Sequence, residues 1–172
     1  EIGLGIPAEP LFRSMNFNPS TARPNALDPT LKSVERIALG NGFDSFIMFN
    51  VYAQRATSPD DMEWTLNEEL HRENMAAFDY ILSLSERPVV WAAWGTIIEK
   101  RDYLWDCLQD MIAIGQEHGA RWVKCGKASA AGHPHHPLYL RADSPIEDFS
   151  AEAYVRRRPT GKKRKKQCEA SL

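Results

Sequence analysis

Three histidines lie close together in one proline-rich segment, Gly132-His133-Pro134-His135-His136-Pro137-Leu138-Tyr139-Leu140. Interleaved prolines cannot continue a helix or a central strand, so we expect a rigid, shaped loop. Imidazole is a common zinc ligand, which makes metal binding one interpretation. Adjacent histidines point in divergent directions, however, and the segment has no nearby cysteine or H-x-x-x-H pair, so we expect no metal site. An imidazole could instead donate a hydrogen bond to a developing anion, or the segment could be a stiffened surface loop.

Two asparagines follow or end apolar segments. Asn18 precedes Pro19 and Ser20, and a single Asn-Pro-Ser step is readily explained by an asparagine that satisfies the backbone of a turn. Asn50 stands within Phe-Ile-Met-Phe-Asn-Val, where an unpaired carboxamide would be costly to bury. We therefore expect Asn50 either to bond a neighbouring backbone group or to face a ligand at the edge of a sheet.

The elements that must position these residues alternate along the chain. Apolar runs predict strands at residues 11–17, 43–51, 88–94 and 120–125, and helical periodicity predicts helices at 29–39, 67–84 and 102–118. This alternation implies parallel strands joined by right-handed crossovers. We expect an α/β fold, a three-layer α/β/α sandwich with a four-stranded parallel central sheet. Ligands of such sheets bind outside the C-terminal ends of the strands, where the polar residues above would meet.

Composition predicts one globular domain. The 172 residues are 43% hydrophobic and 26% charged, and no apolar run approaches the roughly 20 residues that cross a bilayer. We therefore expect no membrane partner, and the N-terminus shows no signal-peptide pattern. The three cysteines, Cys107, Cys125 and Cys168, form no C-x-x-C pair, which favours a reducing, cytoplasmic location. Cys107 and Cys125 are expected to be buried and inert.

The charge is unevenly distributed. Eight of the 21 basic residues lie between Arg156 and Lys166, so the rest of the chain has 13 basic against 23 acidic residues. An acidic body with a basic tail often marks contact with nucleic acid, and a solvated terminus is the alternative. We expect an α/β domain at residues 1–155 and a basic, disordered tail at 156–172. The expected DNA-binding residues are Arg156, Arg157, Arg158, Lys162, Lys163 and Arg164.

A series of motifs resembles an uncharacterised bacterial and phage family, domain of unknown function number sixteen forty-three. The resemblance covers roughly residues 10 to 150. The motifs are Leu11 to Ala22, Asp28-Pro29-Thr30, Phe49-Asn50, Arg55-Ala56-Thr57, Ala93-Trp94-Gly95 and His133 to Leu140.

The same order of motifs is similar to that of the uracil-DNA glycosylase superfamily. There an Asp-Pro or Asn-Pro step follows strand one, an asparagine ends strand two, strand three ends near Trp-Gly, and a His-Pro…Pro-Leu loop follows strand four. The matching residues here are Asn18-Pro19, Asn50, Trp94-Gly95 and His133-Pro134…Pro137-Leu138. The chain departs from the superfamily in three ways: Ser20 replaces a glycine or aromatic residue, Asn16-Phe17 stands where a glycine is usual, and the histidine motif is one residue longer.

The resemblance implies a uracil-DNA-glycosylase-like fold and a monomeric DNA glycosylase. Such an enzyme hydrolyses the N-glycosidic bond of a damaged, deaminated or modified base during base-excision DNA repair, without a metal or organic cofactor. Asn18 would position the water, His133 or His136 would donate to the departing base, and Asn50 would read the base's polar edge. Phe17 or Tyr52 would supply a stacking ring. The implied substrate-binding residues are Phe17, Pro19, Ser20, Asn50 and Tyr52.

Two other functions fit the same sequence. One is a different nucleobase- or nucleotide-processing enzyme that acts on phage-modified DNA. The other is a nucleic-acid-binding module without catalytic activity. The resemblance favours the glycosylase over both.

Overall fold

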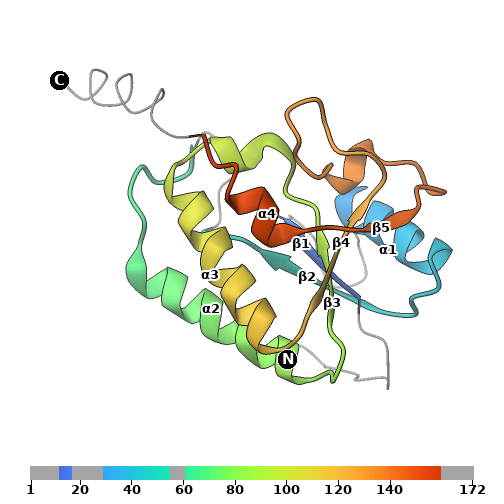
Figure 1. The fold of residues 1–172 in the computed structure, drawn as a ribbon, viewed down its shortest axis with the longest axis horizontal. Coiled ribbons are helices and arrows are strands. Elements are labelled where there is room, and N and C mark those ends of the chain that lie inside the picture. The colour runs from blue at the N-terminus through green and yellow to red at the C-terminus, as the bar shows by residue number, and fades with distance from the viewer. Residues whose placement is uncertain (1–11, 17–28, 55–60, 160–172) are drawn as a thin grey trace.

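A five-stranded sheet forms the centre of the fold (Figure 1). The structure, a computed structural model, describes residues 12–16, 29–54 and 61–159. The strand order across the sheet is β2-β1-β3-β4-β5. The strands are β1 (Phe12–Asn16), β2 (Phe46–Asn50), β3 (Val89–Ala92), β4 (Arg121–Cys125) and β5 (Ile146–Asp148).

The prediction of a four-stranded parallel sheet is wrong, and so is the prediction of a uracil-DNA-glycosylase-like fold class that contained it. The sheet is mixed, because β5 pairs antiparallel with β4, whereas β1 to β4 pair in parallel. Ion pairs from Arg121 to Asp148 and from Lys124 to Glu147 join β5 to its neighbour. The fifth strand gives little sequence signal because it is short and has only one apolar residue, Ile146.

Helices lie on both faces of the sheet (Figure 1). The longest helix, α2, begins after Asn67, whose side chain accepts a hydrogen bond from the backbone N–H of Leu70 at 3.1 Å, as a helix-capping residue does. Two short 3-10 helices, η2 and η3, follow β3 and β4. The helices are α1 (Pro29–Gly40), α2 (Glu68–Ser83), α3 (Tyr103–Glu117), α4 (Ala151–Val155), η2 (Gly95–Glu99) and η3 (Pro137–Tyr139).

The central strand β3 divides the hydrophobic core between the two faces. Val90 and Ala92 point into the larger cluster, with the side chains of α2 and α3. Trp91 points into the smaller cluster, with the side chains of α1. All four residues of β3 are buried, so a continuous apolar run, rather than an alternating one, is the pattern that this strand requires.

The approach of α3 to β4 depends on a glycine. A Cβ atom at Gly115 would lie only 3.0 Å from Nε1 of Trp122. Trp122 is 6% exposed and packs with its ring 6.4 Å from that of Trp94, so it has little room to move.

We therefore expect Gly115→Ala to destabilise the protein, although alanine is a better helix former than glycine by about 1 kcal/mol. Overpacking of the indole costs about 1 to 3 kcal/mol, which should leave a net loss. Urea denaturation gives the free energy of unfolding. The control is the same change in a Trp122→Phe background, where the smaller ring leaves room and the alanine should be neutral or stabilising. An equal loss in both backgrounds would show that Trp122 is not the obstacle.

Candidate functional site

A cavity of about 200 Å³ lies where β3 and β4 end, at the C-terminal edge of the parallel strands. One wall is the segment Trp94 to Ile97, which leaves β3 and forms the first part of η2. The opposite wall belongs to the histidine loop, residues 126–140, which follows β4. Its lining residues are Ser129, Pro134, His135, His136, Leu138 and Tyr139.

A backbone hydrogen bond joins the two walls. The N–H of Gly95 donates to the carbonyl of Pro134 at 2.9 Å. Gly95 has φ of 60°, a conformation that strains other residues. A Cβ atom there would also contact Cβ of His136 at 3.5 Å. The backbone conformation, rather than a lack of space, is therefore what favours glycine at the start of η2.

Two hydrogen bonds hold the end of the histidine loop, one from a side chain of α1 and one at the start of η3. The buried hydroxyl of Ser33 donates to the carbonyl of Pro137 at 2.8 Å. Nδ1 of His136 accepts a hydrogen bond from the backbone N–H of Leu138 at 3.3 Å. Because Nδ1 is an acceptor, the neutral ring carries its proton on Nε2. His136 is thus a pocket residue with a defined hydrogen-bond donor.

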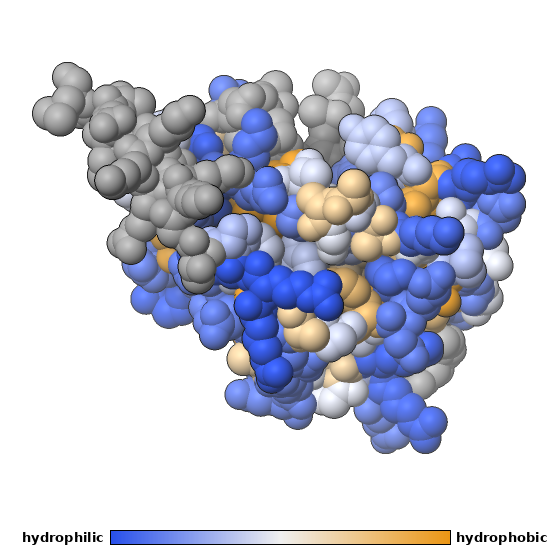
Figure 2. All heavy atoms as spheres, turned by 45° about the horizontal axis from the view of Figure 1, so that its top comes forward, coloured by the Kyte–Doolittle hydropathy of each residue, from blue (hydrophilic) through white to orange (hydrophobic). Residues whose placement is uncertain are grey.

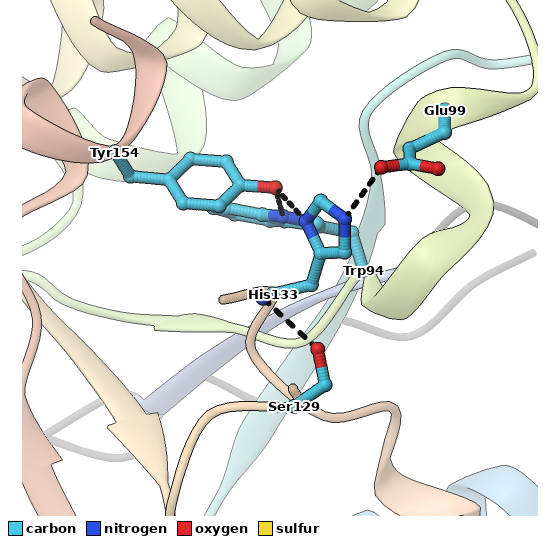
Figure 3. A network of polar contacts seen from close by, with 5 residues as sticks. All are labelled: Trp94, Glu99, Ser129, His133 and Tyr154. Atoms are coloured by element: carbon cyan, nitrogen blue, oxygen red, sulfur yellow. Dashed lines mark hydrogen bonds and ion pairs between the residues drawn. The ribbon is translucent and has the colours of Figure 1, made fainter. Parts of the chain in front are cut away.

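His133 lies in a different environment, in a chain of polar contacts that is buried except at Glu99 (Figure 3). Nε1 of Trp94 lies 3.0 Å from the Tyr154 hydroxyl, which lies 2.6 Å from Nδ1 of His133. Nε2 of His133 lies 3.1 Å from a carboxylate oxygen of Glu99. One assignment satisfies every group: the indole N–H donates to the tyrosine oxygen, the tyrosine O–H to Nδ1, and Nε2–H to the carboxylate.

Burial supports that assignment. Burial is the largest of the effects that raise the pKa of the Tyr154 phenol, so its proton stays in place to donate. His133 is only 3% exposed, and both of its ring nitrogens have partners within the protein. Its main-chain N–H also donates to the hydroxyl of Ser129 at 3.1 Å. His133 therefore anchors the loop, whereas His135 and His136 line the cavity.

The residues predicted near β2 lie apart from the cavity wall. The main-chain carbonyl of Asn50 accepts a hydrogen bond from the side chain of Asn74 at 3.0 Å, and this bond caps the end of β2. Asn50 pairs with Asn16 of β1, which separates β2 from β3. Tyr52 is fully buried, with its ring 5.2 Å from that of Tyr103, and it therefore offers no face for stacking.

Several other predicted residues fall outside the described ranges. These are Phe17, Asn18, Pro19, Ser20, Lys162, Lys163 and Arg164. Arg156, Arg157 and Arg158 are described and directly follow α4. Arg158 forms an ion pair with Asp106 of α3 and donates to the carbonyl of Asp102 at 2.8 Å. Its contacts are therefore with the domain itself.

Thiol and metal chemistry gain no support from the described residues. Cys107 and Cys125 are buried, as predicted, and burial raises their thiol pKa to about 12 and about 11 respectively. Neither forms the reactive thiolate near neutral pH. Within residues 12–16, 29–54 and 61–159, no group of three His, Cys, Asp or Glu side chains is arranged to hold a metal ion. The helices in these ranges are also too short or too polar to cross a membrane.

Sequence reasoning missed Glu99, Tyr154 and Ser33. Each acts on the histidine loop from a distant part of the chain, Tyr154 from α4 and Ser33 from α1. Ser150, which caps α4 by accepting from the N–H of Ala153 at 3.4 Å, is the local signal that a helix carries Tyr154. No feature of the sequence near Tyr154 indicates that its hydroxyl contacts His133.

We expect Tyr154→Phe to lower the free energy of unfolding by about 2 to 6 kcal/mol. It leaves the Trp94 indole N–H and Nδ1 of His133 buried without partners, at about 1 to 3 kcal/mol each. Chemical denaturation measures the loss. The matched control is Tyr80→Phe, because Tyr80 is 58% exposed on α2 and should tolerate the change. Equal stability of the two variants would refute the assigned role of the Tyr154 hydroxyl.

Comparison with known proteins gives one family. No curated protein and no solved structure matches the chain. The model of the family described as "Protein of unknown function (DUF1643)" matches residues 7–138, which include the Trp94 to Ile97 wall and the histidines. The predicted relation to family number sixteen forty-three is confirmed, whereas the relation to uracil-DNA glycosylases stays a prediction. Because the match covers more than half of the chain, the protein belongs to the DUF1643 family.

Proposed function

We propose that the protein is a DNA glycosylase that hydrolyses the N-glycosidic bond of a damaged, deaminated or modified base. The observation that carries this proposal is the small cavity with His136 in its wall at the C-terminal edge of the sheet. At about 200 Å³ it is smaller than the pockets of drug-sized ligands, which measure roughly 300 to 1,000 Å³. It therefore suits a single ring system such as a base turned out of a nucleic-acid strand.

The reaction requires a donor that reaches the ligand. Water attacks C1′ of the sugar while the C1′–N bond breaks and its electron pair leaves with the base. The base then carries negative charge, which a fixed donor stabilises. His136 is a lining residue of the cavity, whereas His133 is buried and is not one of its lining residues. We therefore assign the donor to His136 and a positioning role to His133.

The attacking water would be held by a residue that follows the neighbouring strand, β1. β1 runs parallel to β3, with Met15 opposite Ala92, so both strands end at the edge that carries the cavity. Asn18 follows the end of β1 by two residues. Its carboxamide can accept from the water and orient it, and one proton of that water finally moves to the base. The reaction thus balances with water as the only co-reactant.

The proposal is tested with labelled oligonucleotides that each contain one altered base, in single- and double-stranded form. Alkali breaks the strand wherever a base has been removed. We expect strand breaks with at least one member of the panel. Binding without breaks on any member would contradict the glycosylase and favour the binding module.

The two histidines should give opposite phenotypes. His136→Gln should lower the single-turnover rate at least roughly 100-fold, the scale of a lost anion-stabilising donor, with little change in stability. His133→Gln should lower the melting temperature first, because it breaks the contacts with Tyr154 and Glu99.

A third histidine variant serves as the control. His118 ends α3, at the opposite edge of the sheet, and contacts Asp79 at 2.7 Å. His118→Gln should therefore leave the cleavage rate unchanged. A full rate for His136→Gln combined with a large rate loss for folded His133→Gln would reverse our assignment.

A further inference from the structure

One tryptophan of the chain is exposed. Trp64 is 71% exposed, whereas Trp91, Trp94, Trp105 and Trp122 are each 6% exposed or less. These are all five tryptophans of the sequence. A single exposed apolar ring is ordinary on a protein surface, but exposed aromatic rings are also frequent contact points for nucleic-acid bases.

A buried arginine holds the exposed indole in place. The guanidinium carbon of Arg101 lies 4.1 Å from the centre of the Trp64 ring. Arg101 is itself only 5% exposed, and its three nitrogens donate to the main-chain carbonyls of Glu63, Lys100 and Met62 at 3.1, 2.9 and 2.6 Å. These bonds fix the plane of the guanidinium, and stacking on it orients the indole. The ring is therefore preorganised, with one face on Arg101.

This pair lies next to the segment that forms the cavity. Arg101 comes two residues after Glu99, the last residue of η2, and Gly95 to Ile97 of the same short helix line the cavity. Glu99 in turn contacts His133 of the histidine loop. Trp64 thus packs on Arg101, just after the end of η2, whereas the cavity lies at the beginning of η2.

We propose that Trp64 and Arg101 form a stacking site for an unpaired base of single-stranded DNA, next to the nucleotide whose base enters the cavity. The placement of that neighbouring nucleotide rests on the proposed function, and the stacking site itself does not. Stacking needs a base with a free face, which a strand outside a duplex supplies and a base pair inside a duplex does not. The site therefore assigns single-stranded nucleic acid as the preferred form of the substrate.

The face that carries η2 and the histidine loop favours a polar ligand over an apolar protein partner. Figure 2 brings forward the side of the molecule where, in Figure 1, η2 and the histidine loop lie. The hydrophobic side chains visible there form small separate patches among hydrophilic ones. A protein interface with an apolar core would need a larger continuous patch. A nucleotide needs only a single aromatic ring with polar surroundings.

Intrinsic fluorescence provides a direct test, because Trp64 is the one tryptophan that a ligand in solution can readily cover. Titration of the full chain with an oligothymidine of ordinary, uncleavable nucleotides should quench the emission and saturate. The matching duplex should quench weakly. Trp64→Phe should abolish most of the quenching but retain most of the affinity measured by fluorescence anisotropy of a labelled strand. Trp64→Ala should weaken binding by roughly 5- to 150-fold, the range measured for removal of one stacking ring.

The control variant is Tyr80→Ala, which removes another exposed aromatic ring, on α2, and should leave the affinity unchanged. Circular dichroism confirms that each variant is folded. Equal affinity of Trp64→Ala and the unaltered protein, or equal quenching by single strand and duplex, would overturn the proposal. The oligothymidine contains no altered base, so quenching without any cleavage of the base panel would remove the glycosylase alone. Cleavage without quenching would remove the stacking site alone.

Discussion

The geometry of the cavity depends on the hydroxyl group of Tyr154. Its oxygen accepts from the indole of Trp94, where β3 ends, and its proton is donated to His133 in the histidine loop. Both partners are buried, so neither could turn to water if the bond were lost. The observed placement of α4 satisfies both of them at once. The antiparallel strand β5 leads the chain into α4, which explains why a strand that adds little to the core matters for the site.

The elements visible in the sequence are those whose burial needs an unbroken apolar run. β3 lies within the predicted segment 88–94, because a buried parallel strand must be apolar on both faces. β2 lies within the predicted segment 43–51, although its residues are only half-buried at the edge of the described sheet. β5 was missed for the converse reason. Glu147 and Asp148 face cations of β4 rather than the core, so the strand depends on cross-strand ion pairs that no periodicity displays. A parallel-sheet prediction follows naturally when such an edge strand is overlooked.

The histidine loop could be found from sequence, but the roles of its members could not. His133 and His136 are equivalent candidates when only their spacing is known. They differ because Tyr154 and Glu99, 21 and 34 residues away in the sequence, occupy the ring nitrogens of His133. Trp64 was overlooked for a similar reason. An isolated tryptophan in a polar segment is ordinary, and only the guanidinium of Arg101 against its ring gives it a fixed orientation.

The uneven charge of the chain favours contacts with nucleic-acid bases over contacts with phosphates, if the protein acts on DNA as proposed. Outside Arg156 to Lys166 the chain has 13 basic and 23 acidic residues, so its body repels phosphates at long range. Affinity must then come from the basic segment or from contacts that do not require phosphate. The proposed stacking on Trp64 and the proposed enclosure of a base in the cavity are contacts of the second kind, and salt screens such contacts little compared with ion pairs. A strand with accessible bases gains both contacts, whereas a closed duplex presents mainly its phosphates. Under the proposed function, the acidic body disfavours duplex DNA more than it disfavours an open strand, and we expect base accessibility, rather than backbone charge, to be the basis of recognition.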